Sequence, residues 1–147
     1  MIPRLVVVLL AGLLPLLARA SDAPVNYAGH YELVDTHPER VFRLDLQPSG
    51  SRFKLVFFAA ITNQDGAQPK GRGLGRVNGD GVLEFTFHDD FGNEGTGTLT
   101  RTDVVSQSYH LEMRVTQFVD PGPLHFYGAL TMHKISDAAP KSAVAQE

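Results

Sequence analysis

A basic, glycine-rich segment at residues 70–77, KGRGLGRV, offers the first candidate binding chemistry in this sequence. Its cations alternate with glycines, so one of the two sets faces into the domain if the segment is a β-strand. With the cations inside, Arg72 and Arg76 could bind the head group of an anionic ligand. The candidate ligand site in the interior then comprises Phe57, Arg72, Arg76, Phe85 and Phe87.

The turn at residues 78–81, NGDG, decides which of these sets faces inward. A two- or four-residue loop places the arginines on the same face as Phe85 and Phe87. A three-residue loop with a glycine bulge places the glycines there instead, where bare backbone leaves room for the rings. Because burying two unpaired guanidinium groups is costly, the sequence favours glycines inside and arginines outside.

Acidic and amide side chains gather in a second segment, the loop 89–95, DDFGNEG. Oxygen-rich loops can bind calcium. Here, however, Phe91 occupies the third position, where the calcium-loop pattern requires Asp or Asn. We therefore predict no metal site, and expect either a solvated turn or a contact surface for a protein partner. The candidate partner-binding residues are Asp89, Asp90, Asn93, Glu94 and, in the turn 120–124, Asp120.

No residue pattern in the chain indicates an enzyme. There is no Cys and no G-x-S-x-G sequence to supply an activated nucleophile. The six His residues lack the short spacings that are typical of zinc sites. We predict a protein without catalytic residues, metal or cofactor.

The segment 52–61, RFKLVFFAAI, is the densest apolar run outside the N-terminus, and the fold must be organised around it. Alternate residues from Phe53 to Ile61 share one face, yet the opposite face is also largely apolar. High β-propensity, low charge and the absence of Pro make such a strand prone to self-association when its edge is exposed. We expect a central strand with both edges paired, which closure of a barrel achieves most completely.

Seven further strands are predicted, at residues 27–35, 40–47, 70–77, 82–88, 96–101, 108–118 and 124–135. Short turns rich in Gly, Pro, Asn and Asp separate most of them, and no segment shows helical periodicity. The connections look local, without the long crossover that a Greek key requires. The sequence therefore predicts an all-β fold, a single antiparallel β-barrel of about eight strands, with a β-sandwich as the alternative.

Gly29-His30-Tyr31, at the start of the first predicted strand, resembles the Gly-x-Trp opening of lipocalin-type (calycin) barrels, with Tyr in place of Trp. The resemblance covers this short signature and the number of strands. It implies an up-and-down barrel whose interior could carry a small ligand.

The N-terminus has the pattern of a cleaved secretory signal peptide at residues 1–20. Arg4 precedes a thirteen-residue apolar stretch, and Ala18 and Ala20 provide small residues before the predicted cleavage site. Removing Arg4 and Arg19 leaves 11 Lys and Arg against 16 Asp and Glu, a net charge of −5, which argues against nucleic-acid binding. We expect a periplasmic or secreted bacterial protein without a membrane span after processing, with a β-barrel domain at 21–135 and a disordered tail at 136–147.

Two functions remain open from the sequence. The first is a non-catalytic binding module that acts on a protein partner in the cell envelope, of the inhibitor or toxin-immunity type. The second is a lipocalin-like carrier that holds a small apolar or anionic amphipathic ligand inside the barrel.

Overall fold

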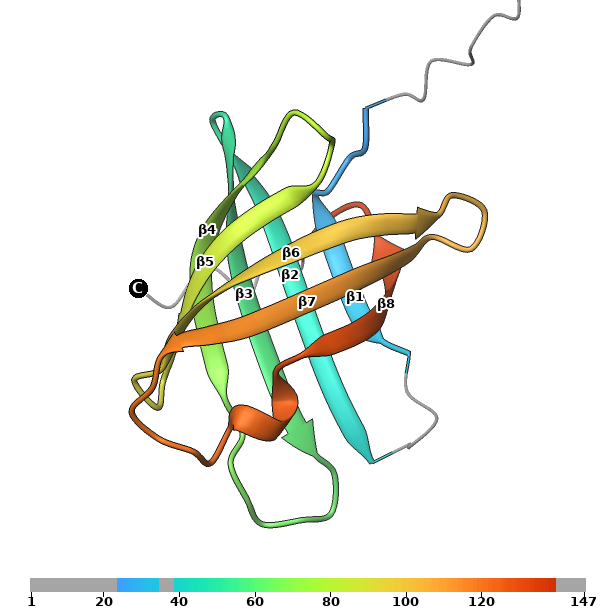
Figure 1. The fold of residues 1–147 in the computed structure, drawn as a ribbon. Coiled ribbons are helices and arrows are strands. Elements are labelled where there is room, and N and C mark those ends of the chain that lie inside the picture. The colour runs from blue at the N-terminus through green and yellow to red at the C-terminus, as the bar shows by residue number, and fades with distance from the viewer. Residues whose placement is uncertain (1–23, 35–38, 140–147) are drawn as a thin grey trace, which may run out of the picture.

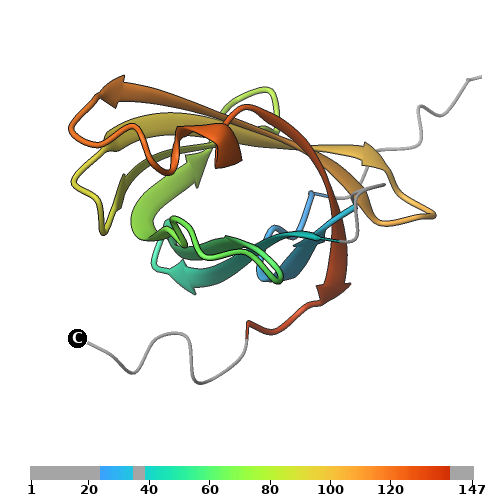
Figure 2. The ribbon, with the colours of Figure 1, turned by 90° about the horizontal axis from the view of Figure 1, so that it is seen from below.

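Eight antiparallel strands follow one another around a closed barrel in the computed structural model, which describes residues 24–34 and 39–139 (Figure 1, Figure 2). Each strand pairs with the next in sequence, and pairing of β1 with β8 closes the ring. The prediction of an all-β barrel is confirmed, and the sandwich alternative is wrong. The strands are β1 (Gly29–Leu33), β2 (Arg40–Ser49), β3 (Arg52–Ile61), β4 (Lys70–Val77), β5 (Leu83–Asp89), β6 (Glu94–Asp103), β7 (Ser108–Gln117) and β8 (Ala129–Ser136).

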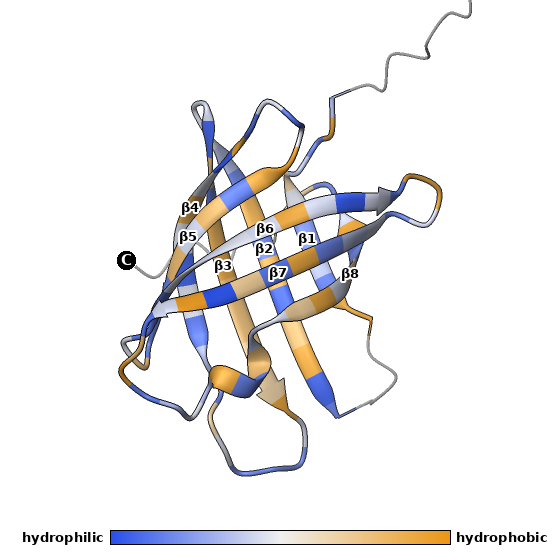
Figure 3. Ribbon diagram, viewed as in Figure 1, coloured by the Kyte–Doolittle hydropathy of each residue, from blue (hydrophilic) through white to orange (hydrophobic). Residues whose placement is uncertain are grey.

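Alternation of apolar and polar residues along each strand decides which side chains form the core (Figure 3). On β5, Leu83, Phe85 and Phe87 are buried, whereas Glu84 and Thr86 between them are exposed. The same two-residue period places the other large apolar side chains inside the ring, where they form one continuous cluster. The barrel thus buries its apolar face without help from a disulfide, since the chain has no Cys.

Strand β3 is paired along both edges, as its composition requires. Its ladder with β2 runs from Arg52 opposite Ser49 to Ile61 opposite Arg40. On its other edge, β3 pairs with β4 from Phe53 to Phe58, and the Ala59 N–H donates to the Pro69 carbonyl beyond that ladder. This pairing removes the free edge on which a second chain could add a strand.

The end of the chain differs from the predicted strand 124–135. Residues Leu124–Phe126 form a short 3₁₀ helix, η1, which lies at the lower end of the barrel in Figure 1 and buries Phe126 in the core. Pro121 and Pro123 precede η1, and Gly128, with a φ of 131°, separates it from β8. Pro lacks the N–H that a strand ladder needs, so the strand starts only after these residues.

Several predictions concern residues outside the described ranges. The predicted signal peptide at residues 1–20 and most of the predicted disordered tail lie there, as do residues 35–38 at the end of the first predicted strand. The last strand ends at Ser136, one residue beyond the predicted end of the domain.

Candidate functional site

Three phenylalanines of the predicted interior site face into the barrel, where each packs on a glycine of a neighbouring strand. A Cβ atom added at the glycine would meet the ring at 2.1 Å for Gly71 and Phe57, 2.3 Å for Gly97 and Phe85, and 2.5 Å for Gly95 and Phe87. The rings also contact one another, with centroids of Phe57 and Phe87 5.6 Å apart. The aromatic rings therefore occupy the space that the glycine-rich strands leave inside the barrel.

The two arginines of that predicted site lie on the outer face, which corrects the interior assignment of Arg72 and Arg76. Both side chains are exposed, and Arg72 Nε donates to Nε2 of His88, also on the outer face, at 2.9 Å. The reason is the register of the β4–β5 hairpin. The Asn78 N–H donates to the Val82 carbonyl around a three-residue loop that ends at Gly81, whose φ is 79°.

The two loops proposed as a partner surface lie side by side at one end of the barrel, and Asn93 joins them (Figure 1, Figure 2). Its side-chain oxygen accepts hydrogen bonds from the backbone N–H groups of Val119 and Asp120, at 2.8 and 3.0 Å. Its Nδ2 donates to the Asp120 carbonyl at 3.0 Å and to the Asp89 carboxylate. Asn93 is fully buried, so its hydrogen bonds fix one loop against the other.

The carboxylate of Asp89 is the second buried polar group of this end. Its Oδ1 accepts from the backbone N–H groups of Phe91 and Asn93, both at 2.9 Å. Its Oδ2 accepts from Asn93 Nδ2 at 3.0 Å and from the Tyr127 hydroxyl. Four donors thus compensate the cost of removing the carboxylate from water. Asp89 and Asn93 therefore hold the loops together, and their buried side chains do not belong to the outer contact surface.

Tyr127 completes this cluster from the segment between η1 and β8. Burial, and then the Asp89 carboxylate that accepts its hydrogen bond, raise the pKa of the Tyr127 phenol above its usual value of 10.0. Burial likewise raises the pKa of Tyr31. The folded protein therefore keeps these phenols neutral at a pH where the unfolded chain loses their protons.

We expect stability to fall as the pH rises above about 10, where the unfolded state releases tyrosine protons that the folded state retains. Each such phenol lowers the free energy of unfolding by at most about 1.4 kcal/mol per pH unit in this range. In Tyr127→Phe the free energy of unfolding should decrease less steeply with rising pH. Its value at pH 7 should nevertheless be lower than in wild type, because a hydrogen bond to Asp89 is lost. Urea unfolding followed by circular dichroism at pH 9 to 11.5 measures both. Identical slopes in the two proteins would contradict the role of Tyr127.

We call the surface formed by the exposed residues of segments 89–94 and 118–123 the acidic end. Phe118 and Val119 are exposed on it, at 59% and 61% of their full accessible surface. The carboxylates of Asp90 and Glu94 are exposed beside them, and Asp120 is half-buried. Two apolar side chains thus stand among acidic groups on loops that an internal hydrogen-bond network fixes.

Sequence reasoning missed Phe118 and Tyr127 as parts of this site. Phe118 follows the exposed residues Glu112, Arg114 and Thr116 at a two-residue period, so its outward direction was readable from the strand pattern. Tyr127 is 38 residues from Asp89 in sequence, and no spacing signal connects the two.

Among residues 24–34 and 39–139, no group of three or more His, Cys, Asp or Glu side chains is arranged to hold a metal ion. Within the same ranges, no helix is long and apolar enough to cross a membrane. Comparison of the chain with protein families, curated proteins and solved structures finds no match. The likeness to lipocalins is therefore limited to the closed eight-stranded antiparallel barrel.

Proposed function

We propose that this chain is an exported, non-catalytic binding module that acts on a protein partner through the acidic end. The observation that carries the proposal is the exposure of Phe118 and Val119 on loops that Asn93 ties together. Large apolar side chains on a backbone that hydrogen bonds already order make effective anchors in an interface, because less backbone entropy is lost on binding. The signal-peptide pattern at residues 1–20 and the absence of Cys support export to a bacterial periplasm.

The charges around these anchors indicate the chemistry of the partner. Asp90 and Glu94 are exposed on the same end of the barrel, with Asp120 half-buried between the loops. Complementary charge speeds association and selects among partners. We infer a partner with an apolar pocket ringed by Lys and Arg, as an enzyme or toxin held by an envelope inhibitor or immunity protein could present.

The lipocalin-like carrier receives less support than the binding module. Phe57, Phe85 and Phe87 pack on glycines and on one another inside the barrel, and the arginines expected to hold an anionic head group lie outside. A ligand in the interior would have to displace packed rings, which is costly in a dense core.

Phe118→Asp should abolish partner binding without unfolding the protein, because the side chain is exposed and a carboxylate cannot enter an apolar pocket. We would release the wild-type protein gently from the cell envelope of its host and record native mass spectra. A protein complex in wild type that is absent in Phe118→Asp supports the proposal. A bound small-molecule mass without a protein partner would support the carrier instead.

Val105→Asp is the matched control for this experiment. Val105 is 96% exposed in the turn between β6 and β7, at the end of the barrel opposite the acidic end. The change adds the same charge to an exposed apolar position, so the complex should survive it. Loss of the complex in both variants, or retention in both, would remove the acidic end from the proposal.

A further inference from the structure

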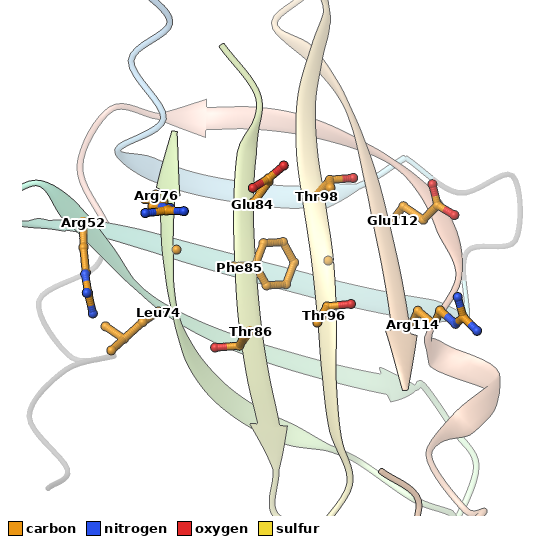
Figure 4. Close-up of a pocket in the computed structure, with 12 residues that line it drawn as sticks. Arg52, Leu74, Arg76, Glu84, Phe85, Thr86, Thr96, Thr98, Glu112 and Arg114 are labelled. Carbon is orange, nitrogen blue, oxygen red and sulfur yellow. The ribbon is translucent and has the colours of Figure 1, made fainter. Parts of the chain in front are cut away.

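A groove of about 670 Å³ lies on the outer face of β4–β7 (Figure 4). Its floor consists of the short side chains Thr86, Thr96 and Thr98 on β5 and β6. Longer side chains form its two walls, on β3 and β4 at one side and on β7 at the other. The groove is separate from the acidic end, because its residues lie on strands β3 to β7 and none of them belongs to segments 89–94 or 118–123.

The strand register lines up the side chains that cross this groove. Arg76 on β4 is opposite Glu84 on β5, Glu84 is opposite Thr98 on β6, and Thr98 is opposite Glu112 on β7. Neighbouring strands are about 4.8 Å apart, so this row spans about 14 Å. A parallel row runs from Leu74 through Thr86 and Thr96 to Arg114. The groove can therefore hold an extended chain that crosses the strands.

Two guanidinium groups stand at the wall formed by β3 and β4. Phe53 pairs with Gly75, which brings Arg52 alongside Arg76, and both side chains are exposed. Within the described part of the chain, neither has a hydrogen bond or ion pair. Neighbouring Glu84 accepts a hydrogen bond from Asn78 Nδ2 at 2.8 Å and forms no ion pair with Arg76. Two exposed arginines at neighbouring strand positions, without other side-chain partners, can together bind one carboxylate, which each guanidinium can hold through two N–H groups.

Leu74 stands on the same wall as these arginines, and its side chain is 45% exposed (Figure 4). A ligand that fits this wall offers a carboxylate to the arginines and an aliphatic group to Leu74. The C-terminal residue of a polypeptide has both when it is, for example, valine or leucine. We propose that the groove binds the C-terminal segment of a polypeptide whose last residue is aliphatic. Its terminal carboxylate is held by Arg52 and Arg76, and its last side chain packs on Leu74.

The rest of the groove fits the chain that precedes such a terminus. Threonine hydroxyls both donate and accept hydrogen bonds, so Thr86, Thr96 and Thr98 can meet the N–H and C=O groups of a crossing peptide. An extended chain advances about 3.3 Å per residue, so the row of about 14 Å accommodates four or five residues. No aromatic side chain is exposed in the groove to stack on a sugar ring, which favours a peptide over a glycan.

The test uses a pool of fluorescein-labelled pentapeptides with four randomised positions and valine, leucine or isoleucine at the end. Fluorescence anisotropy is measured with the free acids and with the same pool as C-terminal amides. The free acids should bind at least about tenfold more tightly, because the amide removes the charge that the guanidinium groups bind. No binding of the acids, or equal binding of acids and amides, would overturn the proposal.

Arg76→Gln should weaken binding of the free acids by about tenfold, since a charge-assisted hydrogen bond is lost. Arg72→Gln is its matched control, because Arg72 is exposed on the same face of the same strand but outside the groove. This control should bind within about twofold of wild type. If both variants lose the same affinity for the free acids, the attraction is a general electrostatic one, and the proposed carboxylate site is overturned. Phe118→Asp should leave peptide binding unchanged, because Phe118 lies outside the groove. The proposal for the groove and the proposal for the acidic end can therefore be tested independently.

Discussion

Asp89→Ala is expected to destabilise the protein by about 3–5 kcal/mol, because it leaves several buried donors without an acceptor. Asp89 is only 5% exposed and accepts four hydrogen bonds, from two backbone N–H groups, Asn93 Nδ2 and the Tyr127 hydroxyl. The alanine side chain has no acceptor, so these donors lose the partner that offsets the cost of their burial. Urea unfolding at pH 7, followed by circular dichroism, measures the change.

Asp90→Ala is the matched control for this prediction, since it removes the adjacent carboxylate. Asp90 is exposed and accepts one hydrogen bond, from the Lys70 backbone N–H at 2.9 Å. Its loss should cost no more than about 1 kcal/mol. Asp89→Asn keeps the shape of the side chain and should fall between the two alanine variants, because an NH₂ donor replaces one of the carboxylate oxygens that accept these hydrogen bonds. Equal stabilities of Asp89→Ala and Asp90→Ala would show that the buried network does not hold this end.

The barrel could be predicted from the sequence because its two main signals are local. Alternation of apolar residues predicted the inward face of each strand, and short turns predicted that neighbours in sequence pair in space. The orientation of Arg72 and Arg76 was also decided by one local feature, the loop at 78–81. Its three-residue geometry puts the glycines of β4 opposite the rings of β5, which is the arrangement that the cost of burying guanidinium groups favoured.

In the acidic loop, the two-residue period of the flanking strands predicts more than the sequence analysis took from it. The inward positions of β5 are the odd residues from Leu83 to Phe87, and the next odd residue is Asp89. Asn93 likewise precedes the inward residues Gly95 and Gly97 of β6. Extending the period by one step places both polar side chains inside the barrel. Composition alone predicted exposed side chains in this loop, as a solvated turn or as a contact surface, because Asp and Asn are usually exposed.

The Tyr127 partner of Asp89 was beyond the reach of the sequence pattern. Val119 and Asp120 lie beside Asn93 because they follow the β6–β7 ladder, in which Glu94 pairs with Gln117, whereas Tyr127 reaches Asp89 from the irregular segment between η1 and β8. Contacts of this kind depend on the three-dimensional path of irregular segments, for which neither strand period nor turn type gives a rule. The exposed anchors of the acidic end depend on the same contacts, since Asn93 fixes the N–H groups of residues 119 and 120.

Gly97→Ala is expected to cost about 3 kcal/mol, although it adds a single methyl group. A Cβ atom at this position would lie 2.3 Å from Phe85 Cζ and 2.6 Å from the Glu112 carbonyl oxygen. The Phe85 ring is buried next to the Phe87 ring and the carbonyl belongs to the β7 backbone, so neither can move away freely. Urea unfolding of the variant and wild type at pH 7 gives the difference.

Gly79→Ala provides the matched control, because no atom lies within 4 Å of a Cβ at Gly79 and its φ is not in the left-handed region. This change should leave stability within about 1 kcal/mol of wild type, in the stabilising direction, since alanine restricts the unfolded chain. Phe85→Leu removes the end of the ring, so Gly97→Ala should cost about 1–2 kcal/mol less in that background than in wild type. The contact with the Glu112 carbonyl remains, which is why the rescue is partial. If Gly97→Ala costs the same in both backgrounds, the ring does not occupy the space above Gly97. The interior would then have room for a ligand, and the carrier function would regain its support.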